Sequence, residues 1–350
     1  MPITLAQAQI NSQSDVDYAV IDQLRRYSWL LDQIVWDDVV TPGTNGGSLE
    51  YAYTRLVTAA PAAFRAINAE YSPGQATRQR YSAALKPLGG AFQVDRALAD
   101  LGPAATNEIS FQMQQLLVSV RTRFQQELIL GDTAVDSLGF DGLSKALAGS
   151  TTEFFPGSTT RYVDWTSPAL TSVDKAHDAM DVLDEWLSTI MPSQTGGATG
   201  QPGDVPPGVK AILGNTKSIT RVRSIARRAA MHTAAKDDLG RTVERYGEWV
   251  LVDIGDRVDG ASPIIPIETR DPDGAGSGGN ISGLTDLYAV SFGLDALHAA
   301  SPAGRPLVRT WLPDYERSGA VKTGEVEMGP VAMVLKKSRA AGVLRNVKVQ

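Results

Sequence analysis

The side chains that most often carry chemistry are few and scattered in this sequence. Its three histidines, His177, His232 and His298, are far apart, and none belongs to a metal-ligand spacing. Cysteine is absent, so neither disulfides nor thiolate metal sites are available. Neither a Gly-x-Ser-x-Gly nucleophile elbow nor a His-Glu-x-x-His zinc motif occurs. We therefore expect partly exposed structural histidines, and no metal, cofactor or catalytic centre.

Two short stretches resemble ligand loops but depart from the required patterns. Residues 214–218 (GNTKS) follow an apolar run, yet a phosphate loop needs glycine directly before its Lys-Ser/Thr pair. Residues 271–274 (DPDG) begin like a calcium loop, but Ser282 stands where the bidentate glutamate is required. The first stretch predicts a capped turn and the second an ordinary loop. A solvated helix face, rather than a catalytic pair, is predicted for Asp181, Asp184 and Glu185.

The bulk composition is that of an ordinary globular chain. It has 350 residues, of which 43% are hydrophobic and 21% charged, enough for two compact units. The formal net charge of −6 lacks the basic excess of a dedicated nucleic-acid binder. No run approaches the roughly 18 apolar residues of a membrane span, and the first residues do not resemble a secretory signal. We expect no membrane partner.

The N-terminal part predicts an arm, a helix and a long out-and-back strand pair. Residues 1–14 are small and polar, and apolar residues then recur at helical spacing until about Trp36. Residues 48–60 alternate like a strand, 61–75 form a polar excursion marked by Pro and Gly, and 76–94 alternate again. A lone two-stranded hairpin is marginal in water, so this excursion needs a neighbour to become ordered.

The clearest predicted element is a helix over residues 103–130. Gly102-Pro103 is a start signal and Gly131 is a stop signal. At 1.5 Å per residue, the helix would be about 42 Å long. Its single apolar stripe consists of Ile109, Met113, Leu116, Val120, Phe124 and Leu128. One stripe on so long a helix indicates that it lies along a sheet or a neighbour.

The second half predicts an α/β unit followed by a strand-rich tail. A helix is expected over about 172–191, and a strand at Val209–Leu213 precedes a helix that reaches about residue 235. Further strands are expected at 248–254, at 263–268 and throughout the tail from residue 284. Loops are expected at 192–208 and 271–283.

The order of these elements resembles the major capsid proteins of tailed bacteriophages, whose Hong Kong ninety-seven fold is shared with encapsulin shells. The resemblance covers nearly the whole chain. It includes Phe140-Asp-Gly-Leu143, similar to the F-x-G-L that often follows the long helix in that family, and the closing segment GVLRNVKV. It implies an α+β fold with an N-arm, an extended β-hairpin E-loop, a P-domain of long spine helix and β-sheet, and an α/β A-domain.

The resemblance also implies how the chain is divided. The implied segments are an N-arm at 1–26, a first P-domain segment at 27–48, an E-loop at 49–94, a P-domain at 95–167 with spine helix 103–130, an A-domain at 168–283, and returning P-domain strands with a closing C-terminal strand at 284–350.

The family assembles as pentamers and hexamers into the icosahedral shell around the phage DNA, and is not enzymatic. The implied partners are further copies of the chain, a scaffolding protein, a portal, optionally a decoration protein, and packaged double-stranded DNA held non-specifically. The implied location is the virion capsid, assembled in the bacterial host cytoplasm. Two departures matter: Lys86 is the only lysine in 48–94, which argues against E-loop cross-linking, and the chain starts near the N-arm, so scaffolding is expected to be a separate protein.

Two groups of residues are candidates for contact. The expected inter-subunit contacts on the E-loop are Phe64, Ile67, Tyr71, Arg78 and Arg80. The densest basic cluster lies on the helix after Asn215 and comprises Arg221, Arg223, Arg227 and Arg228. It could contact nucleic acid, but the negative net charge favours ion pairs with neighbouring subunits or a solvated face.

Three other functions fit parts of the sequence. An encapsulin-like compartment would enclose cargo enzymes instead of DNA, and particle contents would discriminate it. A tail or adaptor protein would form a single ring rather than a closed shell. A phosphate-binding α/β enzyme would use the 214–218 turn, and nucleotide binding by monomers would reveal it.

Overall fold

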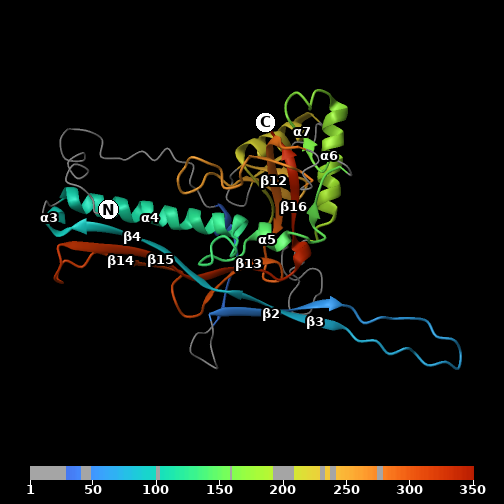
Figure 1. Cartoon of the computed structure of the whole chain (residues 1–350), viewed down its shortest axis with the longest axis horizontal. Coiled ribbons are helices and arrows are strands. Elements are labelled where there is room, and N and C mark those ends of the chain that lie inside the picture. The colour runs from blue at the N-terminus through green and yellow to red at the C-terminus, as the bar shows by residue number, and fades with distance from the viewer. Residues whose placement is uncertain are drawn as a thin grey trace.

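The computed structural model describes residues 29–40, 49–99, 103–157, 160–191, 209–228, 233–236, 242–273 and 279–350. It has three parts (Figure 1): a long helix lying on a sheet, an upright α/β unit at one end of that helix, and a hairpin that projects from the junction. The expected arm at 1–26 and the loop at 192–208 lie outside the described residues. Within the described part, no helix is long and apolar enough to cross a membrane.

The long helix α4 spans Pro103–Leu130, the predicted bounds. Beneath it lies a five-stranded sheet in the order β1-β13-β15-β14, with β4 also paired to β15. The strands are β1 Trp36–Val40, β4 Lys86–Asp95, β13 Leu297–Pro302, β14 Val308–Trp311 and β15 Val321–Leu335. The predicted stripe faces this sheet: Phe124 and Leu128 are fully buried, and the Phe124 ring lies 5.5 Å from that of Trp36.

Close contact between α4 and β4 depends on a glycine. A Cβ added at Gly90 would lie 2.6 Å from Leu116 Cδ1, closer than carbon atoms can approach. A larger residue at this position would require the Leu116 side chain to move. The short helix α3, Arg96–Ala99, follows β4 directly.

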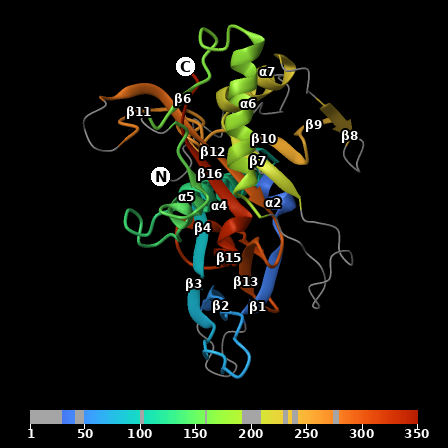
Figure 2. The same ribbon diagram turned by 90° about the vertical axis from the view of Figure 1, so that its right-hand side faces the viewer.

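The α/β unit contains a nine-stranded sheet in the order β5-β16-β12-β7-β10-β9-β8, with β6 paired to β16 and β11 to β12. Its strands are β5 Glu153–Phe154, β6 Val163–Asp164, β7 Lys210–Gly214, β8 Thr233–Lys236, β9 Thr242–Tyr246, β10 Trp249–Asp253, β11 Glu268–Arg270, β12 Ile281–Ser291 and β16 Ala341–Lys348. Helices α6, Val173–Ser188, and α7, Thr216–Arg228, cover one face (Figure 2).

Both faces of this sheet are buried. Ile212 and Leu287 point into the core under α6 and α7, whereas Ala211, Leu213 and Tyr288 point into the core shared with α4. Side chains alternate between the two faces along a strand, so residues 210–214 contribute to both cores. This short segment is therefore almost continuously apolar. The core shared with α4 also contains residues of α2, Trp29–Gln33, and α5, Leu143–Leu147.

A buried polar network fixes the closing strand β16 against its neighbours. Asp286 of β12 accepts hydrogen bonds from the Arg345 guanidinium at 2.9 Å and the Asn346 backbone N–H at 3.0 Å. Arg345 also donates to Glu153 at 2.9 Å, and Arg270 pairs with Asp286. The neighbouring carboxylate of Asp286 raises the pKa of Arg345. Charged groups are tolerated here because each has a partner.

Four local predictions were wrong, each for a tertiary reason. The helix expected to reach 235 ends at Arg228, because residues 233–236 form β8 and pair with β9. The strand expected at 263–268 begins only at Glu268, as β11: consecutive Ile264 and Ile265 are both buried in the core, and Pro266 has no N–H for a ladder.

The other two concern strand pairing. The returning half of the excursion is two strands, β3 Thr77–Ala84 and β4, separated by buried Leu85. Residues 36–40 form β1, which pairs in parallel with β13, where the pattern predicted the end of a helix followed by a loop. In the tail, β12 and β16 join the α/β sheet while β13–β15 join the sheet under α4, so 284–350 is divided between two sheets.

Candidate assembly surfaces

The projecting hairpin consists of β2, Glu50–Thr58, and β3, paired antiparallel, with the tip formed by residues 59–76. Figure 1 shows it extending away from the rest of the molecule. The predicted contact residues Phe64, Ile67 and Tyr71 lie in the tip with exposed fractions of 106%, 91% and 65%. Arg78 and Arg80 lie on β3, exposed, opposite Leu56 and Thr54. The structure thus places all five on one projection that buries almost none of its apolar surface.

The tip has local order despite its exposure. The Arg65 guanidinium lies over the Tyr71 ring, 5.3 Å from its centroid, and donates to the backbone oxygens of Ala66 and Ala69 at 3.2 Å. A backbone bond from Ala69 N to Ala66 O closes the turn at 3.1 Å. These contacts order the turn and hold the Tyr71 ring in place, which reduces the entropy that this ring loses on docking.

The root of the hairpin is attached to the body by an aromatic and arginine cluster. Arg55 donates from Nε to Lys336 O at 2.9 Å and from Nη2 to Leu335 O at 2.8 Å. Its guanidinium also lies 4.4 Å from the Tyr81 ring centroid, and Tyr81 stacks on Tyr53. The Tyr53 hydroxyl donates to Leu335 O at 3.0 Å. The alternation of residues 48–60 predicted this strand but not that Tyr53 and Arg55 bind the end of β15.

A buried histidine lies next to this root. His298 of β13 is fully buried, its ring is edge-on to Tyr51 at 5.5 Å, and Nε2 lies 3.8 Å from Asp37 Oδ2. Tyr51 donates to the same carboxylate at 2.7 Å, and burial together with that bond raises the pKa of Tyr51. Burial, aided by the nearby Lys336 ammonium, lowers the pKa of His298 to about 4. The prediction of partly exposed histidines is wrong for His298, and no sequence signal revealed its position.

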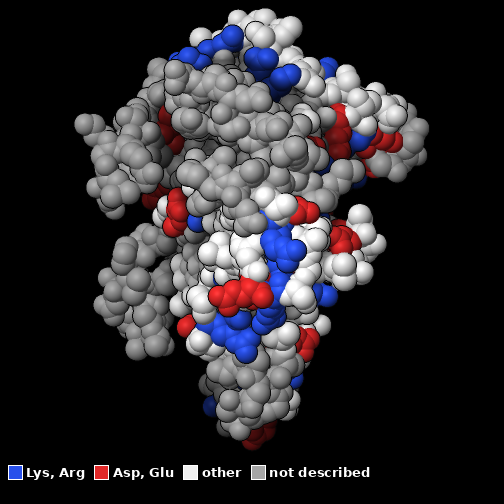
Figure 3. All heavy atoms as spheres, turned by 90° about the vertical axis from the view of Figure 1, so that its left-hand side faces the viewer, with Lys and Arg blue, Asp and Glu red and all other residues white. Residues whose placement is uncertain are grey.

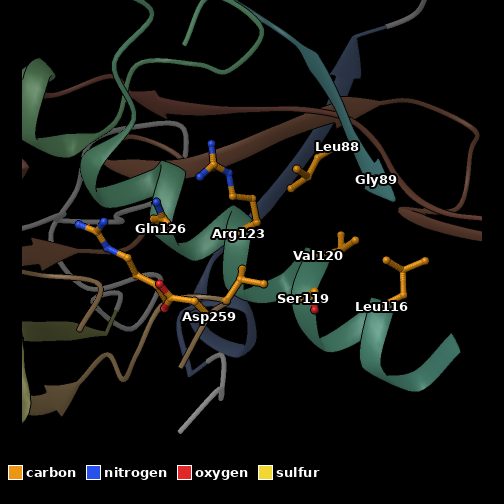
Figure 4. A pocket seen from close by; sticks show the side chains of 10 residues that line it. Leu88, Gly89, Leu116, Ser119, Val120, Arg123, Gln126 and Asp259 are labelled. Atoms are coloured by element: carbon orange, nitrogen blue, oxygen red, sulfur yellow. The ribbon is translucent and has the colours of Figure 1, made fainter. Parts of the chain in front are cut away.

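Two of the hollows on the surface lie close to the hairpin root and to α4. One, of about 550 Å³, lies under the hairpin root and is lined by residues that include Arg55, Lys86 and Lys145. The other, of about 440 Å³, lies between β4 and α4 (Figure 4). Leu88, Leu116 and Val120 form its apolar end, and Arg123, Gln126 and Asp259 lie at its polar end. Both are open surface features of mixed polarity.

The 214–218 turn is filled by its own side chains. Asn215 Oδ1 accepts from Ser218 N at 2.9 Å, so the first turn of α7 is capped internally. The Asn215 amide donates to Thr285 Oγ1 and Ile265 O, and Ser218 is buried. A Cβ on Gly214 would meet Leu287 Cδ2 at 2.7 Å. A phosphate would have to displace these groups, in line with the predicted capped turn.

The other candidate ligand groups are also engaged in structure. Residues 271–273 form a turn whose Pro272 oxygen accepts from Asn346 Nδ2 at 3.0 Å. Asp184, expected on a solvated face, is exposed and accepts from the Tyr246 hydroxyl at 2.7 Å. Burial, together with this hydrogen bond, raises the pKa of Tyr246. Among the residues that the structure describes, no three His, Cys, Asp or Glu side chains are grouped as metal ligands. His177 is exposed, and His232 lies outside the described residues.

The basic cluster on α7 is only partly engaged. Arg223 pairs with Glu244 of β9, and Arg221 Nε donates to Val349 O at 3.3 Å. Arg227 and Arg228 are exposed at the end of the helix. Figure 3 shows Lys and Arg side chains gathered at the top of that view, the end of the molecule where Figure 1 places α6 and α7.

Comparison with known proteins identifies the fold. No family model and no curated protein matches the sequence. Among solved structures, the holo-SrpI encapsulin complex from Synechococcus elongatus PCC 7942 aligns with a TM-score of 0.56 at 14% identity, covering 100% of this chain and 98% of that one. The capsid of an empty GTA particle aligns at 0.54 and 13%, covering 98% and 97%. The capsid of the Cyanophage P-SCSP1u aligns at 0.54 and 7%, covering 98% and 94%.

These likenesses extend over whole chains, so they concern the complete architecture rather than one sheet. The chain has the Hong Kong ninety-seven capsid fold, and the predicted α+β fold class with hairpin, long helix and α/β unit is confirmed. At 7–14% identity, the likeness concerns the fold, and the roles of individual residues follow from their own contacts.

Proposed function

We propose that this chain is the major capsid protein of a tailed bacteriophage. It is a non-enzymatic subunit that self-assembles as pentamers and hexamers into the icosahedral shell around the phage DNA. The observation that carries this proposal is the projecting hairpin, which exposes Phe64, Ile67 and Tyr71 on a fold that recurs in capsid structures. A monomer gains nothing from such a projection, whereas a shell subunit can bury it against a neighbour.

The energetics of the tip support docking on a second copy. Burying a large apolar side chain contributes about 1.5–3 kcal/mol. The tip offers three of them, and one, Tyr71, is already held by its contact with Arg65. Arg78 and Arg80 lie beside the tip and add charged donors that reach beyond the chain. Every subunit of a ring would make the same contact, so its contribution to stability is repeated over the whole shell.

The proposed partners follow from that role. They are further copies of the chain, a separate scaffolding protein, a portal, optionally a decoration protein, and double-stranded DNA held without sequence specificity. The formal charge of −6 supports weak rather than tight contact with the genome. The proposed location is the virion capsid, after assembly in the bacterial host cytoplasm.

Electron microscopy of the expressed protein tests the proposal. Co-expression with a scaffolding protein from a phage that encodes this chain is expected to yield closed shells tens of nanometres wide. A folded monomer that stays inert under these conditions contradicts the proposal. A single open ring would instead indicate a tail or adaptor protein.

An encapsulin-like compartment is the second candidate, because the encapsulin complex aligns over the whole chain. The two candidates share a shell and differ in what it encloses. Nuclease-protected DNA in particles purified from infected cells supports the capsid role. A single co-purifying cargo enzyme, with no protected DNA, supports the compartment.

A further inference from the structure

Helix α6 presents a continuous acidic stripe to solvent. Its inner face, with Ala176, Met180, Leu183 and Trp186, is buried against the sheet. The exposed carboxylates lie at Asp174, Asp178, Asp181 and Glu185. The steps of four, three and four residues put them in one line along the helix. Asp178 pairs with Lys175 at 3.5 Å, but both side chains are highly exposed, so this ion pair contributes little.

Helix α7 presents a basic stripe with the same spacing. Lys217, Arg221, Ser224 and Arg228 lie in one line, again with steps of four, three and four residues. Lys217 and Arg228 are exposed, and Lys217 donates to Gln350 Oε1. Arg221 is half-buried and donates to Val349 O at 3.3 Å. Arg227 is exposed beside Arg228. The helix contains no acidic residue. Each line covers twelve residues, or eleven steps along the helix, and is therefore about 16 Å long at 1.5 Å per step.

The two stripes do not neutralise each other within one molecule. Although α6 and α7 pack side by side through Ala179, Leu183, Ile219 and Val222, the ion pairs of the described residues join α6 to its own Lys175 and α7 to Glu244 of β9. Like charges four residues apart are mildly destabilising in an isolated helix. Each stripe thus carries a repulsion that a partner of opposite charge would relieve.

We propose that the acidic stripe of α6 in one copy docks against the basic stripe of α7 in the next copy around a ring. This inference rests on the proposed shell function. A contact between two different surfaces of the same chain is heterologous, and repetition of such a contact closes a ring. Matched length and opposite charge make these two surfaces complementary.

A second copy explains the pair of stripes better than DNA does. Nucleic acid would be attracted to α7 but repelled by the neighbouring α6 carboxylates, which lie on the same face of the sheet. A second copy uses both stripes at once. It also gives Arg227 and Arg228, which bind no carboxylate among the described residues, a partner from outside the chain.

The test is a charge swap. One variant carries Asp174→Lys, Asp178→Lys and Asp181→Lys, a second carries Lys217→Glu, Arg227→Glu and Arg228→Glu, and a third carries all six changes. All six positions are exposed, so circular dichroism and thermal unfolding are expected to match the unaltered chain. Shell yield is measured by sedimentation and electron microscopy over a concentration series.

Each three-residue variant is expected to need at least about tenfold more protein to assemble, because like charges then face each other at every contact. The six-residue swap is expected to return to within about threefold of the unaltered chain. Assembly of the unaltered chain is expected to weaken as salt rises from about 0.1 to 1 M, where the Debye length falls from about 10 to 3 Å. If the six-residue swap assembles no better than the weaker of the two three-residue variants, the inference is overturned.

Two further outcomes are informative. If the α7 variant assembles normally but loses DNA binding in a gel shift, the basic stripe serves nucleic acid and the inference is overturned. If the unaltered chain forms no closed particles at all, the proposed function fails first. Shells that form normally in both three-residue variants leave the proposed function intact and overturn only the stripe contact.

Discussion

The projecting hairpin and the nine-stranded sheet are both β structure, but they obtain their order in opposite ways. The sheet is covered on both faces, and its central strands β7 and β12 are almost entirely buried. The hairpin is a two-stranded ribbon attached to the body at its root by Tyr51, Tyr53 and Arg55, and its side chains closer to the tip are largely exposed. The sheet therefore carries its stability within the chain, whereas the hairpin obtains its own from the root and from whatever covers the tip.

This contrast separates folding from assembly within one sequence. Changes in the sheet and under α4 are expected to alter the free energy of unfolding of the monomer. Changes at the hairpin tip are expected to alter association and leave that free energy unchanged. Changes at the root are expected to affect both association and the free energy of unfolding, because the root joins the hairpin to the body.

The largest expected effect is on assembly. Replacement of residues 61–75 by a short Gly-Ser linker is expected to abolish shell formation, because the three exposed apolar side chains of the tip are lost. Urea unfolding of the monomer is expected to be unchanged. Electron microscopy and denaturation together make the measurement.

A triple conservative variant is the matched control for that deletion. Phe64→Leu, Ile67→Val and Tyr71→Phe keep most of the apolar area and are expected to preserve shells. Normal shells from the deletion variant would show that the tip is not an assembly contact.

The next effect is on folding of the body. Phe124→Ala removes a fully buried ring that packs on Trp36 and Phe140. It is expected to lower the free energy of unfolding by about 3–5 kcal/mol. Phe64→Ala at the tip is the matched comparison and is expected to stay within about 0.5 kcal/mol. If both substitutions lowered the free energy of unfolding by the same amount, the proposed difference between body and hairpin would be contradicted.

Acid is expected to act at the root. The pKa of His298 is lowered from 6.5 to about 4, so between these values the unfolded chain binds a proton that the folded chain does not. Stability from this residue is therefore complete above pH 6.5 and is lost as pH falls toward 4, by about 3 kcal/mol in total. The groups around it, Asp37, Tyr51, Lys336 and Asp295, stay in place in the comparison variant His298→Phe.

The measurement is the difference in unfolding free energy between the original chain and His298→Phe from pH 7 to 4. The variant is expected to lose the part of the slope that lies between pH 6.5 and 4, while the carboxylate contributions are common to both. Parallel curves would contradict the assignment of that slope to His298.

The smallest effect concerns attachment of the hairpin alone. Arg55→Lys cannot reproduce the two carbonyl contacts and the stacking on Tyr81, because an ammonium lacks the planar fork of guanidinium. The backbone amides of β2 and β3 are expected to exchange hydrogen faster, and their protection free energy is expected to fall by about 1–2 kcal/mol. Arg80→Lys on the same hairpin, where the side chain is exposed, is the control and is expected to change nothing.

The elements that local sequence predicted well share one property. The helix α4 has a Pro start, a Gly stop and a stripe repeated over its length, so its bounds followed from residues near each other in the chain. The helix α6, capped by Ser172, and the strand β7 also lay close to their predicted bounds. The exposed tip was predicted because apolar residues stood isolated among polar ones and turn signals.

By itself, the sequence determined which segments are helical, which alternate as strands, and that residues 61–75 leave the core. Only the tertiary structure decided which strands meet: β3 pairs with β2, β4 continues into the sheet under α4, and the tail divides between two sheets. It also decided that His298 is buried beside Asp37 and that Arg345 and Asp286 join β16 to β12. Pairing and burial depend on residues that lie from tens to hundreds of positions apart, and the free energy of such contacts leaves no period in the local sequence.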